Sequence, residues 1–422
     1  MSTAPRAAIV VTGDEVLRGR VADRNGSYLA AWCDAHGIAV ERLTIVGDDR
    51  APIASTLRNH IAAGVDLLIT TGGLGVTHDD LTMSAVSDAT GVPLVTHLDA
   101  LALVRAATAS APHHAAVPAR IRDATERKQS NLPRGALMLA PIGTAPGCIV
   151  SIGAQLVVVL PGPPFELERM WTHAVTTPSL LELIARAGGP PRRVLRLHGV
   201  VESQLVAALD QIPPNTRDGA RLGICAKAGE VELTLADIAR GGAERLGDAI
   251  EQAFPGATFT RTGQHIEQVI GEMLAGRGQR VAVAESCTGG LLGSRLTSVP
   301  GASQWFLGGV IAYDNQVKHN ALGVADEILI TDGAVSSPSA AAMACGVRKT
   351  TAAHWGVSIT GIAGPGGGTP EKPVGTVFVG CAGPNTTDVE EHHFRGDRAL
   401  IRERACVSAL HLLRRALADT AM

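Results

Sequence analysis

The chain has 422 residues, of which 45% are hydrophobic and 18% charged, and its formal net charge at pH 7 is −3. This length predicts two or three domains with packed cores, and the near-neutral charge excludes a general nucleic-acid-binding surface, so no nucleic-acid partner is expected. The seven cysteines form no CxxC pair and no 18-residue apolar run or apolar leader occurs, which argues against zinc sites, disulfide frameworks, membrane partners and secretion, and makes the cytoplasm the expected location.

Strands and helices alternate over the first part of the chain. Short apolar runs predict strands at residues 7–11, 40–46, 66–71 and 156–160. Apolar residues at helical spacing predict helices at residues 28–36, 53–63, 81–90 and 165–174. This alternation predicts an α/β domain over residues 1–171, with a doubly wound and mostly parallel sheet.

Three loops rich in glycine or carboxylates follow these strands, at the sheet edge where such folds bind ligands. The loop residues that allow backbone N–H groups to approach a phosphate are Gly13, Gly72, Gly73, Gly75, Pro161 and Gly162. The carboxylates suited to Mg²⁺ or a similar divalent metal are Asp14, Glu15, Asp79 and Asp80. The alternative is that these acidic residues cap helices or are solvated, but three such loops together favour a phosphate ligand.

These loops resemble motifs of a known family. The motifs are Thr12-Gly-Asp-Glu, Thr71-Gly-Gly-Leu-Gly with Asp79-Asp80, and Leu160-Pro-Gly-Pro-Pro. They are similar to the molybdopterin-binding fold of MoaB, MogA and MoeA, and residues 6–255 resemble the amino-terminal half of CinA proteins (competence/damage-inducible protein A). The resemblance implies a metal-dependent pyrophosphatase that acts on ADP-ribose or a related dinucleotide. Val76 departs from the proline usual in the family, and Asp14 from the usual threonine.

The middle of the chain carries fewer signals. Alternating patterns predict strands at residues 193–198 and 230–236, and a helix is predicted at residues 244–253. Residues 172–255 are therefore predicted to form a small α+β connecting module, and residues 256–264 to form a linker.

A second α/β domain is predicted over residues 265–422. The predicted strands are residues 281–285, 309–313, 357–360, 374–381 and 389–394. The predicted helices are residues 265–274, 291–299, 340–351 and 397–417. The first strand ends in Glu285-Ser-Cys-Thr-Gly-Gly, which predicts a tight strand-to-helix turn.

That turn is a candidate catalytic site. Ser286 lies where N–H groups at a helix start can stabilise an oxyanion, and the residues expected to contact substrate there are Glu285, Thr288, Gly289 and Gly290. A plain helix cap with turn glycines is the alternative. Cys287 is a rival nucleophile, because thiols are more reactive than hydroxyls at neutral pH.

Other strand ends supply possible partners for Ser286. Lys318 becomes a base if desolvation lowers its pKa, and Ser–Lys is a known alternative to the Ser–His–Asp triad. Tyr313 and Thr360 are expected to relay protons or orient the substrate. The expected phosphate or oxyanion contacts are Gly361, Gly364, Gly366, Gly367, Arg398 and Arg402. Judged alone, Lys318 fits a solvated helix lysine better than a base, because lysine is rarely buried, and the arginines could form an exposed helix face.

This second domain is similar to the carboxy-terminal domain of CinA, which also occurs alone as PncC. The matching segments include Ala284-Glu-Ser-Cys-Thr-Gly-Gly, Tyr313 with Lys318, and Ile359-Thr-Gly-Ile-Ala-Gly-Pro-Gly-Gly-Gly. The resemblance implies hydrolysis of nicotinamide mononucleotide (NMN) to nicotinic acid mononucleotide and ammonia, without a metal or other cofactor. It makes Ser286 the nucleophile and Lys318 its base, with Tyr313 and Thr360 in support. In this chain Asp314 stands where the family more usually has serine.

The sequence thus predicts a bifunctional protein that acts on NMN and on ADP-ribose-like pyrophosphates, and we expect a homodimer. Two alternatives remain open. The amino-terminal half is either catalytic or a nucleotide-binding regulatory domain, and the whole chain is either an enzyme or a non-enzymatic protein of DNA uptake or repair.

Overall fold

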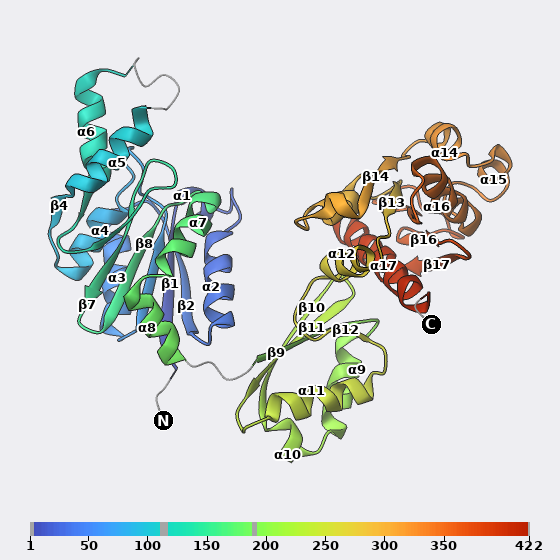
Figure 1. The fold of residues 1–422 in the computed structure, drawn as a ribbon, viewed down its shortest axis with the longest axis horizontal. Coiled ribbons are helices and arrows are strands. Elements are labelled where there is room, and N and C mark those ends of the chain that lie inside the picture. The colour runs from blue at the N-terminus through green and yellow to red at the C-terminus, as the bar shows by residue number, and fades with distance from the viewer. Residues whose placement is uncertain (1–3, 110–116, 188–191, 421–422) are drawn as a thin grey trace. The chain divides into compact units, whose positions relative to one another are not determined.

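The computed structural model describes residues 4–109, 117–187 and 192–420 (Figure 1). The chain forms two compact units, residues 1–190 and residues 191–422. Within the described residues, no helix has the length and apolar character needed to cross a membrane.

The first unit is built on a six-stranded sheet (Figure 1). In spatial order its strands are β2 (Ala39–Val46), β1 (Arg6–Thr12), β3 (Leu67–Thr71), β8 (Gln155–Leu160), β7 (Gly147–Ile152) and β6 (Leu137–Leu139). The first four strands run parallel, as predicted, whereas β7 and β6 add an antiparallel edge that the sequence analysis did not predict.

Helices cover both faces of this sheet, because successive residues of β1 point to opposite sides. Ile9 packs with Leu29 and Trp171 on one face, and Val10 packs with Leu57 on the other. The helices are α1 (Asp14–Leu17), α2 (Asn25–Ala35), α3 (Arg50–Ala62), α4 (Thr82–Thr90), α5 (Leu98–Ala109), α6 (Ala119–Ser130), α7 (Pro164–Ala174) and α8 (Pro178–Ala187), and β4 (Leu94–Thr96) pairs with β5 (Asn131–Pro133). The predicted doubly wound, mostly parallel fold is confirmed.

Helix α8 moves the end of this fold beyond the predicted boundary at residue 171. Leu180 and Leu183 are buried in the same core as Trp171. Residues 172–187 therefore belong to the first unit and not to the middle module, because their apolar face packs beside α7.

The middle module is an antiparallel sheet of four strands with helices (Figure 1). The strand order is β10 (Ala220–Lys227), β11 (Glu230–Asp237), β9 (Arg192–His198) and β12 (Thr258–Thr260). Its helices are α9 (Glu202–Gln211), α10 (Pro214–Arg217) and α11 (Gly242–Ala253). The predicted linker at residues 256–264 thus contains an edge strand, since β12 pairs with β9.

The last domain has a mixed five-stranded sheet. The strand order is β14 (Phe306–Ile311), β13 (Val281–Glu285), β15 (Trp355–Gly361), β16 (Thr376–Ala382) and β17 (Thr387–His393), with the first three parallel and the last two antiparallel. The helices are α12 (Ile266–Gly276), α13 (Leu291–Thr297), α14 (Asn315–Leu322), α15 (Asp326–Thr331), α16 (Ser337–Thr351) and α17 (Arg398–Asp419), with a 3₁₀ turn η2 (Ala302–Gln304).

A buried polar contact joins the middle module to this last domain. His411 of α17 is fully buried, its Nε2 lies 2.8 Å from Glu230 Oε1, and its ring stacks on His198 with centroids 3.7 Å apart. Burial lowers the pKa of His411 to about 2 and that of His198 to about 3. Both rings are therefore neutral at pH 7, and the His411 N–H donates to the Glu230 carboxylate.

Candidate functional site

The turn between β13 and α13 holds the predicted nucleophile. Ser286 is 8% exposed, and its N–H donates to the Ile359 carbonyl at 2.9 Å, which fixes the start of the turn to β15. Gly289 and Gly290 follow with φ of 59° and 93°. Two successive residues in this left-handed region explain the Gly-Gly pair, because other residues are strained there.

Glu285 does not face a ligand, which corrects its predicted substrate contact. Its side chain is 1% exposed and accepts hydrogen bonds from the N–H groups of Gly290 at 2.9 Å, Leu292 at 3.0 Å and Gly293 at 2.8 Å. The Gly289 N–H donates to Ser286 O at 3.1 Å. Among the described residues, no backbone carbonyl accepts from the N–H groups of Cys287 and Thr288, so these two remain available to a ligand.

Lys318 is buried beside this turn rather than solvated. It is 1% exposed, and its Nζ lies 3.2 Å from the Tyr313 carbonyl and 3.5 Å from Asn315 Oδ1. Burial lowers its pKa, while the charge of Asp314 acts in the opposite direction. A larger fraction of neutral amine is the state that a general base requires. Within the described residues, no hydrogen bond joins Lys318 to Ser286.

Cys287 is a poor rival for the nucleophile. Its side chain is 7% exposed, and burial raises the pKa of its thiol to about 11. The thiolate is the reactive form, so a thiol that stays protonated at neutral pH is inert.

Arg398 connects Tyr313 with the glycine-rich loop at residues 361–368. Its guanidinium donates to the Gly364 carbonyl at 2.8 Å and to the Tyr313 hydroxyl at 3.1 Å. Tyr313 is 62% exposed, and Gly366 and Gly367 of the same loop have no close neighbour that would exclude a ligand. Arg398, Tyr313 and the glycine loop therefore form one open polar surface.

Three further residues that were predicted to act on the substrate make contacts inside the protein instead. Arg402 donates to the Thr288 carbonyl, and its Nε is buried without a partner. Thr360 is fully buried and its hydroxyl donates to Ala334 O at 2.7 Å, so the expected proton relay through it is corrected. Gly361 lies against Val377, where any Cβ would come within 2.7 Å, so its small size serves strand packing.

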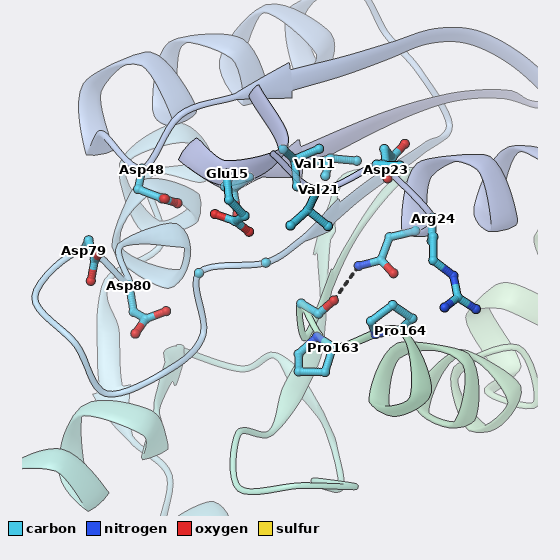
Figure 2. Close-up of a pocket in the computed structure, with 18 of the residues that line it drawn as sticks. Val11, Glu15, Val21, Asp23, Arg24, Asp48, Asp79, Asp80, Pro163 and Pro164 are labelled. Carbon is cyan, nitrogen blue, oxygen red and sulfur yellow. Dashed lines mark hydrogen bonds between the residues drawn. The ribbon is translucent and has the colours of Figure 1, made fainter. Parts of the chain in front are cut away.

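The first unit has a cavity of about 440 Å³ at the carboxyl ends of β1, β3 and β8 (Figure 2). The predicted residues that line it are Gly13, Glu15, Gly72, Gly73, Asp79, Asp80 and Gly162. Gly75 packs against Asp80 instead, and the Pro161 carbonyl accepts a hydrogen bond from Thr71 Oγ1 at 2.7 Å. Neither is among the lining residues.

Carboxylates gather on one side of this cavity, where Figure 2 shows Glu15, Asp48, Asp79 and Asp80. Asp48 replaces the predicted Asp14, whose carboxylate pairs with Arg18 at 2.5 Å. Burial raises the pKa of Asp48, and the charges of Glu15, Asp14 and Asp79 add to this effect. The sequence signal for Asp48 was its place directly after β2, at the same sheet edge.

These carboxylates fit a divalent cation that arrives with phosphates. Among the described residues, no three His, Cys, Asp or Glu side chains lie close enough together to hold a metal by themselves. Mg²⁺ usually binds through one or two carboxylates together with substrate phosphates and water, so a complete protein cage is not required. Thr77 holds Asp80 in place, since its N–H donates to Asp80 Oδ2 at 2.8 Å.

Comparisons with known proteins assign both halves of the chain. Residues 263–417 match the family described as "CinA C-terminal domain", and residues 8–181 match "Probable molybdopterin binding domain". A "CinA-like protein" of Mycobacterium avium (strain 104) is 41% identical and aligns with 99% of this chain and 100% of its own length. A "CinA-like protein" of Mycobacterium tuberculosis (strain ATCC 25177 / H37Ra) is 39% identical and aligns with 99% of this chain and 98% of its own length. A solved structure of competence/damage inducible protein CihA from Agrobacterium tumefaciens is 39% identical, covers 36% of this chain and 93% of its own, and has a TM-score of 0.36.

Proposed function

The chain belongs to the CinA family, as its full-length relatives show, and we propose that its last domain hydrolyses the carboxamide of NMN. The observation that carries this proposal is the buried Lys318, whose lowered pKa suits a general base close to the Ser286 turn. The two unengaged N–H groups of Cys287 and Thr288 supply the oxyanion donors that such a reaction needs.

In the proposed mechanism the neutral Lys318 amine removes the Ser286 proton as Oγ attacks the carboxamide carbon. The N–H groups of Cys287 and Thr288 hold the oxyanion. The Lys318 ammonium then returns its proton to the leaving nitrogen, which departs as ammonia. Water, activated by the same amine, hydrolyses the acyl-enzyme to the carboxylate and regenerates Ser286. Contact between Lys318 and Ser286 is expected to tighten when substrate is bound.

The phosphate of NMN is assigned to Arg398. Arg402 is held by the Thr288 carbonyl, whereas Arg398 is exposed between the Tyr313 hydroxyl and the Gly364 carbonyl. A planar guanidinium in that position suits a bidentate phosphate contact, and the open Gly366–Gly367 backbone lies in the same loop.

The test is release of ammonia and nicotinic acid mononucleotide from NMN with EDTA present. Ser286→Ala and Lys318→Ala are each expected to lower kcat by about 1,000-fold or more, because nucleophile and base act as a unit. Cys287→Ala is the matched control and is expected to keep near wild-type turnover. Full activity in Ser286→Ala, with loss in Cys287→Ala, would move the nucleophile to the thiol.

We further propose that the cavity of the first unit hydrolyses ADP-ribose or a related pyrophosphate. Glu15, Asp48, Asp79 and Asp80 would hold a divalent cation, which when bound neutralises the charge of the phosphates. The backbone at Gly72 and Gly73 allows close approach of the pyrophosphate. The test is Mg²⁺-dependent release of AMP from ADP-ribose by the full chain, with Asp48→Asn as the disabled variant.

A regulatory role for the first unit is the second candidate, since the described carboxylates do not form a complete metal cage. It predicts saturable binding of ADP-ribose without AMP release. Direct DNA contact is disfavoured by the net charge of −3, and tight, salt-dependent DNA binding would be needed to restore it.

A further inference from the structure

We propose that Glu285 is a positioning residue, which shapes the Ser286 turn by capping the first turn of α13 from within the protein. This inference rests on the proposed amidase function. It replaces the substrate contact expected from the sequence with a structural task that the reaction depends on.

The cap closes the nucleophile turn at both ends. Glu285 directly precedes Ser286 in the chain, and its carboxylate accepts from the N–H groups of Gly290, Leu292 and Gly293 at 2.8–3.0 Å. The five residues 286–290 are therefore held as a loop between one side chain and the helix start. We call this set of three hydrogen bonds the Glu285 cap.

A carboxylate is the group that fits this place. It only accepts hydrogen bonds, whereas the glutamine amide carries one oxygen and one NH₂ group. In Glu285→Gln the oxygen could still accept from Gly290 and Leu292, but the NH₂ group would face the Gly293 N–H. A buried carboxylate with no hydrogen bonds would be costly, so the three donors and the carboxylate stabilise each other.

The cap also decides which N–H groups remain for the substrate. The start of a helix normally offers several free N–H groups to an anion. Here Glu285 occupies those of Gly290, Leu292 and Gly293, so the substrate phosphate finds no anion site at α13. The free donors are confined to Cys287 and Thr288, directly beside the Ser286 hydroxyl.

A second contact supports the turn from another element. Arg402 of α17 donates to the Thr288 carbonyl, which orients that peptide group. The Ile311 side chain lies against Gly290, where its Cδ1 would be 3.2 Å from an added Cβ. With the turn fixed elsewhere, loss of the Glu285 cap is expected to misplace the N–H groups without unfolding the domain.

The test compares Glu285→Gln with wild type on NMN. Because a displacement of about 1 Å in reacting groups costs about 100-fold in rate, kcat is expected to fall about 100-fold while KM changes less than about threefold. Hydrogen exchange at the Gly293 amide, which loses its acceptor in this variant, is expected to become faster. If Glu285→Gln does not fold, Glu285→Asp, which keeps the charge but shortens the reach, is expected to show the same kcat loss.

The matched control is Glu267→Gln. Glu267 is 7% exposed and pairs with Arg295 near the other end of α13, so this variant also removes a buried charge that anchors the same helix. It is expected to keep kcat within about threefold of wild type, because the Ser286 turn is untouched. Equal kcat losses in the two variants, or a KM effect alone in Glu285→Gln, would overturn the positioning role.

Failure of the amidase proposal has a different signature. If wild type releases no ammonia from NMN, the proposed function is rejected. The exchange of the Gly293 amide then still decides whether Glu285 holds the turn, since that readout needs no substrate. Unchanged exchange in Glu285→Gln would overturn the cap itself.

Discussion

Asp314 has two effects: it caps helix α14, and its charge acts on the pKa of Lys318. Its side chain caps α14 by accepting from the Gln316 N–H at 2.7 Å, and its charge opposes the lowering of the Lys318 pKa by burial. A residue that caps the helix also makes the proposed base harder to deprotonate.

Asp314→Asn is therefore expected to lower the pKa of Lys318 further. Asparagine caps helices as well as aspartate does, so α14 stays intact while the charge is lost. The rising limb of kcat/KM for NMN against pH is expected to move to lower pH, and kcat/KM on that limb to increase. A pH–rate profile measures this. Glu327→Gln, an exposed acid on α15, is the control, and an unmoved limb in Asp314→Asn would exclude Lys318 as the base.

Single residues differ in how far the sequence predicts them. Ser286 and Lys318 stand in motifs that follow strands, and both side chains are buried, while their catalytic roles stay predictions. The roles of Glu285 and Thr360 were mispredicted because the direction of a side chain at a strand end depends on the packed neighbours. Asp48 was missed although Gly47-Asp48-Asp49 follows β2 in the same way that Gly13-Asp14-Glu15 follows β1.

At the scale of single elements, helix α8 is the last helix of the first unit. Leu183→Ala is expected to cost about 2–5 kcal/mol of unfolding free energy in that unit, because a buried leucine at 2% exposure leaves a cavity. Hydrogen exchange across the chain measures the effect, with faster exchange expected in β1 and β3. Leu209→Ala, in α9, is the reciprocal control for the second unit. Faster exchange in β9 and β11 on loss of Leu183 would instead place α8 with the middle module.

The stacked histidines predict a pH dependence for the second unit. Burial holds the pKa of His198 and His411 far below the ordinary 6.5, so the unfolded chain binds the protons more readily. Stability is therefore complete above pH 6.5 and is lost as pH falls from there toward 3, by about 1.4 kcal/mol per pH unit for each ring.

His198→Phe keeps a stacked ring but removes one titrating group. The slope of unfolding free energy against pH in urea is expected to fall by about 1.4 kcal/mol per pH unit below pH 6.5, the contribution of one ring. His319→Gln, an exposed histidine of α14, should leave the slope unchanged. The same slope in His198→Phe and wild type would contradict the role of the stacked pair.

The buried central strands were predicted, whereas the 12-residue helices α5 and α6 and several edge strands were not. The central parallel strands β1, β3, β8, β13 and β15 are short runs of mostly apolar residues because both of their faces are buried. The middle strand β10 is mostly exposed, and β12 has three residues, so neither carries a strong apolar pattern. Strand β14 ends at Ile311, before the predicted end at Tyr313, because Tyr313 already belongs to the loop that leads into α14.

At the scale of the whole molecule, each unit has its own core and its own candidate site at a sheet edge. The two proposed activities are therefore expected to be separable within the intact chain. Ser286→Ala should abolish ammonia release and leave AMP release unchanged, whereas Asp48→Asn should lower AMP release about tenfold or more and leave ammonia release unchanged. Parallel assays on the same protein samples measure this. Loss of both activities in either variant would show that the sites depend on each other.

The His198–His411 stack also makes the last domain depend on its contact with the middle module. In a protein made of residues 263–417 alone, the His411 ring would face water next to Arg414 and Arg415. Protonation of the ring would then place three positive charges close together on α17. The contact between the middle module and the last domain thus depends on three side chains, His198, Glu230 and His411.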